Sequence, residues 1–297
     1  MPEVEPPPGL LERIWRFPLV QLVVATGVVI AAAQLGSNLL RLAHLPRNSP
    51  QEFAGGLAIA AGIVLAYKGY KRWLERQPDK EFEAAGAARE LGQGLALGFV
   101  LFSLAAGAVW ALGGLQIDGV RGIGQLWSML LMAVISGTLE ETLFRGIVMR
   151  QMEAMIGTWG ALAFTSGFFG LVHLGNEGAT WWSALAIALE AGVLLGAAYL
   201  LTRRLWLAIG IHAAWNFTQG WVFSVPVSGG AAPLGLLVTR RAGPDWLTGG
   251  EFGLEASVVA IVITTLAGIV LLYRAAGKGG FVKPLWSRSV RAAPGAA

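Results

Sequence analysis

The sequence predicts an all-α polytopic membrane protein, with about eight transmembrane helices around a buried polar chamber. Two observations support this fold class. Of the 297 residues, 55% are hydrophobic and only 13% are charged, and the mean hydropathy is +0.60; soluble domains carry roughly 25% charged residues. The apolar residues also gather in long runs between short polar turns, and a helix needs about 20 apolar residues to cross a bilayer.

Composition divides the chain into four parts. Residues 1–16 are Pro-rich and acidic and form a short disordered or interfacial lead. Residues 17–120 hold the first three transmembrane helices, and residues 121–223 hold a core that contains the intramembrane polar residues. Residues 224–297 comprise a Gly- and Pro-rich loop, the last transmembrane helix and a basic tail.

The apolar runs place the expected spans in order along the chain. They cover about 17–39, 53–67, 91–115, 126–149, 157–173, 181–201, 205–223 and 254–273. Between the second and third spans, Lys68 to Arg89 is the longest charged segment, which we expect to be an amphipathic helix on the cytoplasmic surface. The 41 glycines favour helices that pack closely in lipid.

The basic residues predict the orientation of the chain in the membrane. An even number of spans puts both termini on one side, and most of the Lys and Arg residues fall there: Arg13, Arg16, the Lys68 to Arg89 cluster, Arg150, Arg203, Arg204, Arg274, Lys278, Lys283, Arg288 and Arg291. The opposite side holds only Arg41, Arg47, Arg121, Arg240 and Arg241. By the positive-inside rule both termini are cytoplasmic, and we expect an integral protein of a bacterial or archaeal cell membrane.

Two features of the composition exclude classes of function. The chain has no cysteine, which removes thiol nucleophiles, disulfides and Cys-ligated metals. Its net charge of +4 would suit nucleic acid, but the basic residues lie in loops between apolar spans, so we expect a lipid bilayer and no nucleic acid as its partner.

Three ionisable residues interrupt the fourth apolar span. Because a charged side chain costs a few kcal/mol or more at the bilayer centre, Glu140, Glu141 and Arg145 need partners or a function. Neighbouring residues on a helix point about 100° apart, whereas residues four apart share a face. We therefore pair Glu141 with Arg145 and leave Glu140 free; the alternative is a self-neutralised pair beside a protonated Glu that only packs.

Two further polar pairs lie in later spans at helical spacing. Phe169 and His173 are four residues apart, as are His212 and Asn216. If the fourth and fifth helices form a hairpin at Gly157, Glu140 and His173 lie at nearly the same depth on either side of it. At about 1.5 Å per residue, the seventh helix brings His212 and Asn216 to the same layer, near the middle of the membrane.

These three motifs resemble, in order and spacing, those of the type II CAAX prenyl endopeptidases within the CPBP family of intramembrane glutamate proteases and bacteriocin-processing relatives. The resemblance covers about Gln125 to Gln219. It implies that Glu140 and His173 activate a water molecule and that His212 and Asn216 hold the oxyanion, with Glu141, Arg145 and Phe169 in support. It also implies a chamber that opens to the cytoplasm and the inner leaflet.

The chemistry of these residue types agrees with peptide hydrolysis. A carboxylate and an imidazole can deprotonate one water molecule, and an amide and a second imidazole can donate hydrogen bonds to an oxyanion. We expect no cofactor. A zinc site built from Glu140, His173 and His212 stays open as an alternative, although no His-Glu-x-x-His motif is present.

Other functions also remain open at this point. We expect a peptide or lipidated-peptide substrate, but a catalytically silent scaffold or bacteriocin-immunity protein would carry the same spans. A proton-coupled transporter would use the same buried acids as a relay. Glu190, in the middle of the sixth span, either lines the chamber or has an internal hydrogen bond or a partner such as Arg145.

Overall fold

The structure is a computed structural model that describes residues 9–287, and the regular secondary structure within them is helical apart from one two-stranded sheet. Six helical stretches are long and apolar enough to cross a membrane, as judged by length and composition. One of these, Leu126–Gly175, turns back at Gly157, where the backbone is non-helical, so it forms two antiparallel helices. The predicted fold class is confirmed: the chain is an all-α integral membrane protein.

The long helices follow the predicted spans, most of them to within four residues; the second continues eight residues beyond its predicted end, to Glu75, and the fifth begins at Arg150. They are α2 (Pro18–Leu42), α3 (Pro50–Gly69) with η1 (Tyr70–Glu75), α4 (Ala87–Ala111), α5 (Leu126–Glu141) with η2 (Thr142–Met149), α6 (Arg150–Val172), α7 (Trp181–Ile187) with η4 (Ala188–Gly192) and α8 (Val193–Thr202), α9 (Trp206–Phe217) with η5 (Thr218–Val222), and α11 (Val258–Gly277).

The remaining elements are short. They are α1 (Leu10–Trp15), β1 (Leu115–Val120), η3 (His173–Gly175), β2 (Leu237–Arg241), α10 (Asp245–Thr248), η6 (Leu254–Ala256) and η7 (Leu285–Ser287). The strands β1 and β2 pair antiparallel, with Leu115 opposite Arg241.

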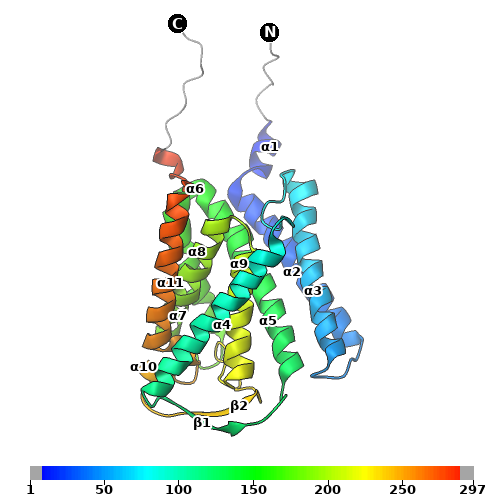
Figure 1. Cartoon of the computed structure of the whole chain (residues 1–297). Helices are drawn as coiled ribbons and strands as arrows, with labels where there is room; N and C mark the ends of the chain where they lie inside the picture. Colours follow the sequence, from blue (N-terminus) through cyan, green and yellow to red (C-terminus); the bar gives the residue numbers. More distant parts are fainter. Residues whose placement is uncertain (1–8, 288–297) are drawn as a thin grey trace.

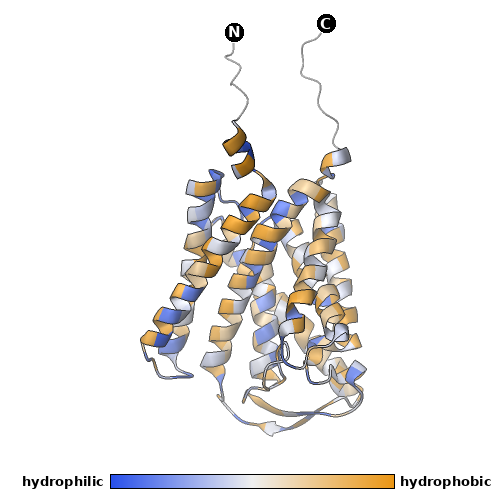
Figure 2. Ribbon diagram, turned by 180° about the vertical axis from the view of Figure 1, so that it is seen from behind, coloured by the Kyte–Doolittle hydropathy of each residue, from blue (hydrophilic) through white to orange (hydrophobic). Residues whose placement is uncertain are grey.

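The long helices form a bundle with two distinct ends (Figure 1). The helices α1 and η7 lie at one end, which we call the terminal end, and β1 and β2 lie at the other, which we call the sheet end. Apolar residues predominate along the helices between the two ends (Figure 2), and large apolar side chains such as Leu65, Phe99 and Leu266 are exposed there. An apolar outer surface of this kind suits contact with lipid.

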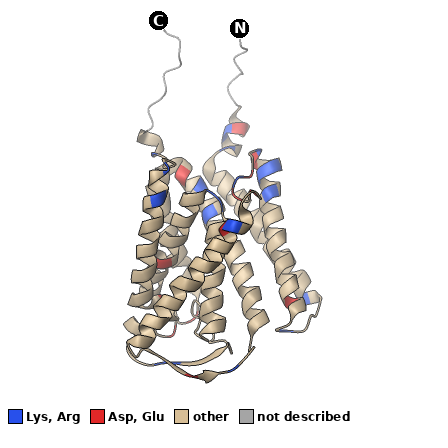
Figure 3. Cartoon of the chain, in the orientation of Figure 1, with Lys and Arg blue, Asp and Glu red and all other residues tan. Residues whose placement is uncertain are grey.

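Most Lys and Arg residues lie at the terminal end (Figure 3). Many of them form ion pairs there: Arg150 with Glu75 at 2.5 Å, Arg203 with Glu153 at 2.6 Å, and Arg204 with Glu90. The tail residues Arg288 and Arg291 lie outside the described residues.

The charged segment from Lys68 to Arg89 does not form the separate amphipathic helix that we expected. Instead α3 continues through η1 to Glu75, and the chain is then non-helical as far as Gly86. Arg76 adopts a left-handed conformation (φ 57°), and Pro78 lacks the N–H that a helix would need. The loop then inserts Phe82 into the core, where its side chain is buried.

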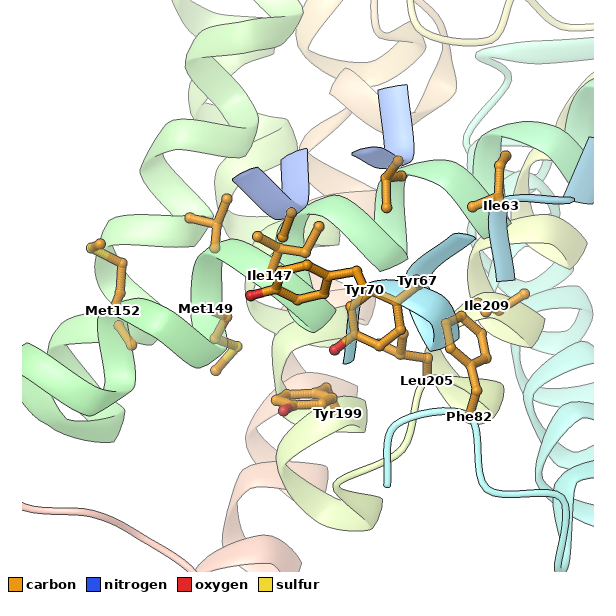
Figure 4. Packing of buried hydrophobic residues seen from close by; sticks show 14 of the residues in the cluster. Ile63, Tyr67, Tyr70, Phe82, Ile147, Met149, Met152, Tyr199, Leu205 and Ile209 are labelled. Atoms are coloured by element: carbon orange, nitrogen blue, oxygen red, sulfur yellow. The ribbon is translucent and has the colours of Figure 1, made fainter. Parts of the chain in front are cut away.

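A packed apolar layer closes the terminal end of the bundle (Figure 4). It contains Tyr67, Tyr70, Phe82, Tyr199 and Leu205, which we call the aromatic plug, and all five are buried. The Tyr67 and Phe82 rings meet edge to face at 5.6 Å. The Tyr67 hydroxyl also donates a hydrogen bond to the Gly146 carbonyl oxygen at 3.0 Å, which ties α3 to η2.

Two glycines of α4 allow α9 to pack very closely against it. A Cβ atom on Gly98 would overlap the Ile211 carbonyl oxygen, and one on Gly94 would overlap that of Leu207. Gly94 also faces Gly210 across the contact, with 2.9 Å between the built Cβ position and the Gly210 Cα. Small residues at such crossings let two backbones approach in a membrane.

The α4–α9 contact predicts a difference between two alanine substitutions. We expect Gly98→Ala to lower the melting temperature in detergent, because overpacking costs about 1–3 kcal/mol. Gly107→Ala in the same helix is the matched control, since nothing lies within 4 Å of its Cβ position. Equal melting temperatures for both variants would show that α4 and α9 do not pack this closely.

Candidate active site

The adjacent residues Glu140 and Glu141 at the end of α5 point in different directions. The Glu140 side chain is 28% exposed and lines a cavity of about 610 Å³, whereas the Glu141 side chain is fully buried. The Oε2 atom of Glu140 has no hydrogen-bond partner among the described residues. One carboxylate is thus available to the cavity and the other is held inside the protein.

The buried carboxylate pairs with Arg145, as the spacing of four residues predicts. Arg145 Nη1 donates to Glu141 Oε1 at 2.8 Å. Arg145 Nη2 donates to the carbonyl oxygens of Ala191 at 2.9 Å and Gly192 at 3.3 Å, in the π-helical segment η4. Its guanidinium also lies 4.8 Å from the centre of the Phe169 ring. The wide turns of η2 and η4 therefore bring the Arg145 side chain between helices; such π segments often occur at functional sites.

The same carboxylate orients His212 on α9. His212 Nδ1 lies 2.9 Å from Glu141 Oε1, and since a carboxylate oxygen accepts, Nδ1 carries the proton of this hydrogen bond. His212 Nε2 then faces Glu140, with 3.9 Å between it and Glu140 Oε2.

His173, at the start of η3, is held in a similar way. Its Nδ1 atom lies 2.7 Å from the Phe169 carbonyl oxygen, which can only accept a hydrogen bond, so Nδ1 donates. The neutral ring therefore has its lone pair on Nε2, and this side chain lines the same cavity as Glu140. The Phe169 ring packs between its neighbours, with its centre 4.6 Å from that of His173 and 6.3 Å from that of His212.

Asn216 lines the cavity one helical turn beyond His212. Its Nδ2 atom donates to the Ser136 hydroxyl at 3.1 Å. Sequence reasoning did not single out Ser136, although it lies four residues before Glu140 and so shares its helix face. The structure thus brings together Glu140, His173, His212 and Asn216, the residues that the motifs predicted, around one cavity.

A loop at the sheet end completes the cavity, and sequence reasoning missed it. The Ser228 carbonyl accepts from Asn176 Nδ2 at 3.0 Å, and the Ser228 N–H donates to Glu255 Oε1 at 2.5 Å. The Gly229 N–H donates to the Phe252 carbonyl at 2.8 Å, with Gly229 at a positive φ of 81°. These partners are far apart in sequence, so no spacing pattern could have revealed them.

Glu190 lies behind this cavity, in η4. With Glu255 it lines a second cavity of about 30 Å³, whose walls also include His173, His212 and Asn216. Both carboxylates are buried, and the Oε2 atom of each has no hydrogen-bond partner among the described residues. Arg145 is held by Glu141 and backbone carbonyls instead, so the expected alternative of a Glu190–Arg145 pair is not formed.

The cavity at Glu140 extends to the sheet end. Its walls run from Glu140 through Met132 and Met129, near the start of α5, to Glu177 and to the loop Val227–Gly230. The aromatic plug fills the space at the terminal end. The first and last described helices, α1 and η7, lie at the opposite end of the bundle. If that end faces the cytoplasm, the outer part of the cavity faces the other side of the membrane.

The described residues contain no group of three or more His, Asp or Glu side chains arranged to hold a metal ion. Glu140, His173 and His212 line one cavity but do not form such a group in this conformation.

The Glu255 carboxyl predicts a pH dependence of stability. Burial raises the pKa of Glu255 to about 8, so the folded protein keeps this proton at pH values where the unfolded chain has lost it. Stability therefore falls as pH rises from the ordinary carboxyl range, about pH 4, towards the raised pKa. Glu255→Gln keeps an acceptor for the Ser228 N–H, and we expect its melting temperature to fall less over this range than that of the wild type. The exposed Glu251→Gln is the control; a wild-type profile in Glu255→Gln would contradict the assignment.

Comparison with known proteins supports the motif analysis. Residues 122–218 match the family model described as "Type II CAAX prenyl endopeptidase Rce1-like". Neither the curated proteins nor the solved structures contain a match to the chain. The matched residues run from the approach to α5 as far as η5, and they include all the predicted site residues. The resemblance read from the three motifs is confirmed for this segment, which is similar to the Rce1-like type II CAAX prenyl endopeptidases and supports a CAAX-type membrane protease.

Proposed function

We propose that this protein is an intramembrane endopeptidase of the glutamate type, which hydrolyses peptide bonds in a chamber within the bilayer. The observation that carries the proposal is that Glu140, His173, His212 and Asn216 come from three helices and line one cavity of about 610 Å³. A peptide or lipidated peptide is the substrate.

Glu140 and His173 activate the water molecule. The Glu140 side chain is 28% exposed and lines the cavity, and His173 presents Nε2 because its Nδ1 is bonded to the Phe169 carbonyl. Together they take the proton from the water as its oxygen attacks the carbonyl carbon of the substrate. The same proton then passes to the leaving amine as the C–N bond breaks, so no external acid or base is consumed.

His212 and Asn216 stabilise the oxyanion that forms during the attack. The Asn216 amide has two N–H groups, and the contact with Ser136 uses one of them. His212 donates from Nε2 when its ring is protonated, since Nδ1 is already bonded to Glu141. Each such donor contributes about 3 kcal/mol at comparable acyl-transfer sites.

Glu141, Arg145 and Phe169 act as positioning residues. Glu141 fixes the His212 ring, and Arg145 balances the charge of Glu141 at 2.8 Å. The Phe169 carbonyl oxygen accepts a hydrogen bond that orients His173, and the Phe169 ring makes a cation–π contact with the Arg145 guanidinium.

The proposal predicts that Glu140→Gln abolishes cleavage of a quenched-fluorescence peptide library by the purified protein. The amide cannot accept a proton from water at neutral pH, so we expect a loss of at least about 100-fold with unchanged melting temperature. Glu177→Gln, a second carboxylate at the mouth of the same cavity, is the matched control and should retain most of the activity.

A chelator arm of the same experiment separates the two ways of activating water. The proposed mechanism predicts equal rates with and without chelator, whereas a zinc-bound water would require the metal. Undiminished cleavage by Glu140→Gln would remove the proposal, and no cleavage by any form would favour a non-catalytic scaffold.

A further inference from the structure

We propose that the chamber receives its substrate from the extracytoplasmic face of the membrane, as a peptide segment with apolar side chains. This inference rests on the proposed function and adds the side and the chemistry of the substrate. It follows from three observations: where the chamber opens, what closes its other end, and which end of the molecule carries the positive charge.

The opening lies at the sheet end. The residues that line the outer part of the chamber are Asn176 and Glu177 after α6, and the loop from Val227 to Pro233 after η5. The first segment joins η3 to α7 and the second joins η5 to β2, both at the sheet end of the bundle. A peptide entering from bulk water at this end would meet Glu140 and His173 directly beneath the loop.

A separate cavity of about 950 Å³ lies at the terminal end, but none of the described residues that line it also lines the chamber at Glu140. The aromatic plug lies between the catalytic layer and that end, with the Phe82 ring packed edge to face on both Tyr67 (5.6 Å) and Trp206 (5.3 Å). Above it, Arg150 is bound by Glu75, and Lys71 bridges to the same carboxylate at 3.1 Å. A substrate arriving from this side would have to break both the apolar packing and the ion pairs.

The distribution of charge assigns the two ends to the two sides of the membrane. The Lys and Arg residues of η1, of the loop that follows it, and of the turn between α8 and α9 all lie at the terminal end, while the sheet end carries few (Figure 3). Loops rich in Lys and Arg stay in the cytoplasm. The terminal end is therefore cytoplasmic, and the sheet end, with the opening, faces away from the cytoplasm.

The chamber wall indicates which side chains the substrate presents. Met129, Met132, Val172, Val227 and Pro233 line the chamber between its mouth and Glu140. Methionine side chains adapt to irregular apolar partners, so a wall of this kind accepts apolar side chains of varied shape.

The absence of cysteine allows a direct test by labelling of single cysteines. The variants are Ala231→Cys at the mouth of the chamber, Glu251→Cys in the sheet-end loop and Gln77→Cys in the terminal-end loop, all at exposed positions. In spheroplasts, a membrane-impermeant maleimide should modify Ala231→Cys and Glu251→Cys, and should reach Gln77→Cys only after detergent opens the membrane. Labelling of Gln77→Cys in intact spheroplasts, with Ala231→Cys protected, would overturn the proposal.

A second arm measures cleavage separately from orientation. A membrane-impermeant quenched peptide with apolar residues is added outside intact spheroplasts that express the wild type or Glu140→Gln. We expect cleavage by the wild type alone; cleavage that requires solubilisation would overturn the proposed side. Failure of the wild type to cleave in either state would count against the peptidase function, and the labelling pattern would still report the orientation.

Discussion

The Glu141 carboxylate is the group on which the rest of the site depends. One oxygen, Oε1, accepts hydrogen bonds from both Arg145 and His212, in a position without solvent exposure. Removing one partner of a buried ion pair costs about 3–5 kcal/mol, because the other charge is left uncompensated. The pair also links helices: Arg145 reaches the carbonyls of η4, and His212 belongs to α9. A single buried negative charge thus sets the relative positions of η2, η4 and α9, and with them the side of the His212 ring that faces Glu140.

Close helix packing allows this polar layer to exist inside an apolar bundle. Glycines of α4 allow one face of α9 to pack closely against α4. His212 and Asn216 of α9 line the chamber. The aromatic plug then separates the chamber from the terminal end. The partly exposed Glu140 carboxylate therefore lies in a cavity on the sheet-end side of this layer, where water can reach it.

Much of the fold and of the predicted site was accessible from the sequence because its signals are local. The apolar runs predicted the helices, the spacing of four residues predicted the Glu141–Arg145 pair, and the position of Gly157 placed Glu140 and His173 at a common depth. The contacts that sequence reasoning missed are non-local. Ser228 with Glu255, for example, joins residues whose separation follows no helical period. The expected amphipathic helix failed because Pro78 and the burial of Phe82 outweighed its charge pattern. The end of the bundle at which the chamber opens depends on how the loops pack. The distribution of charged residues along the sequence carries no information about that packing.

The orientation of the two active-site histidines tests this account most directly. The chain has only 3 histidines, so ¹⁵N-histidine labelling gives a simple spectrum of the protein in detergent or lipid. The account predicts that the signals of His173 and His212, assigned with His44→Gln and His173→Gln variants, show a protonated Nδ1 at neutral to alkaline pH. It also predicts that Glu141→Ala removes this state for His212 alone. A lone pair on Nδ1 of His212 in the wild type would contradict the central role of Glu141.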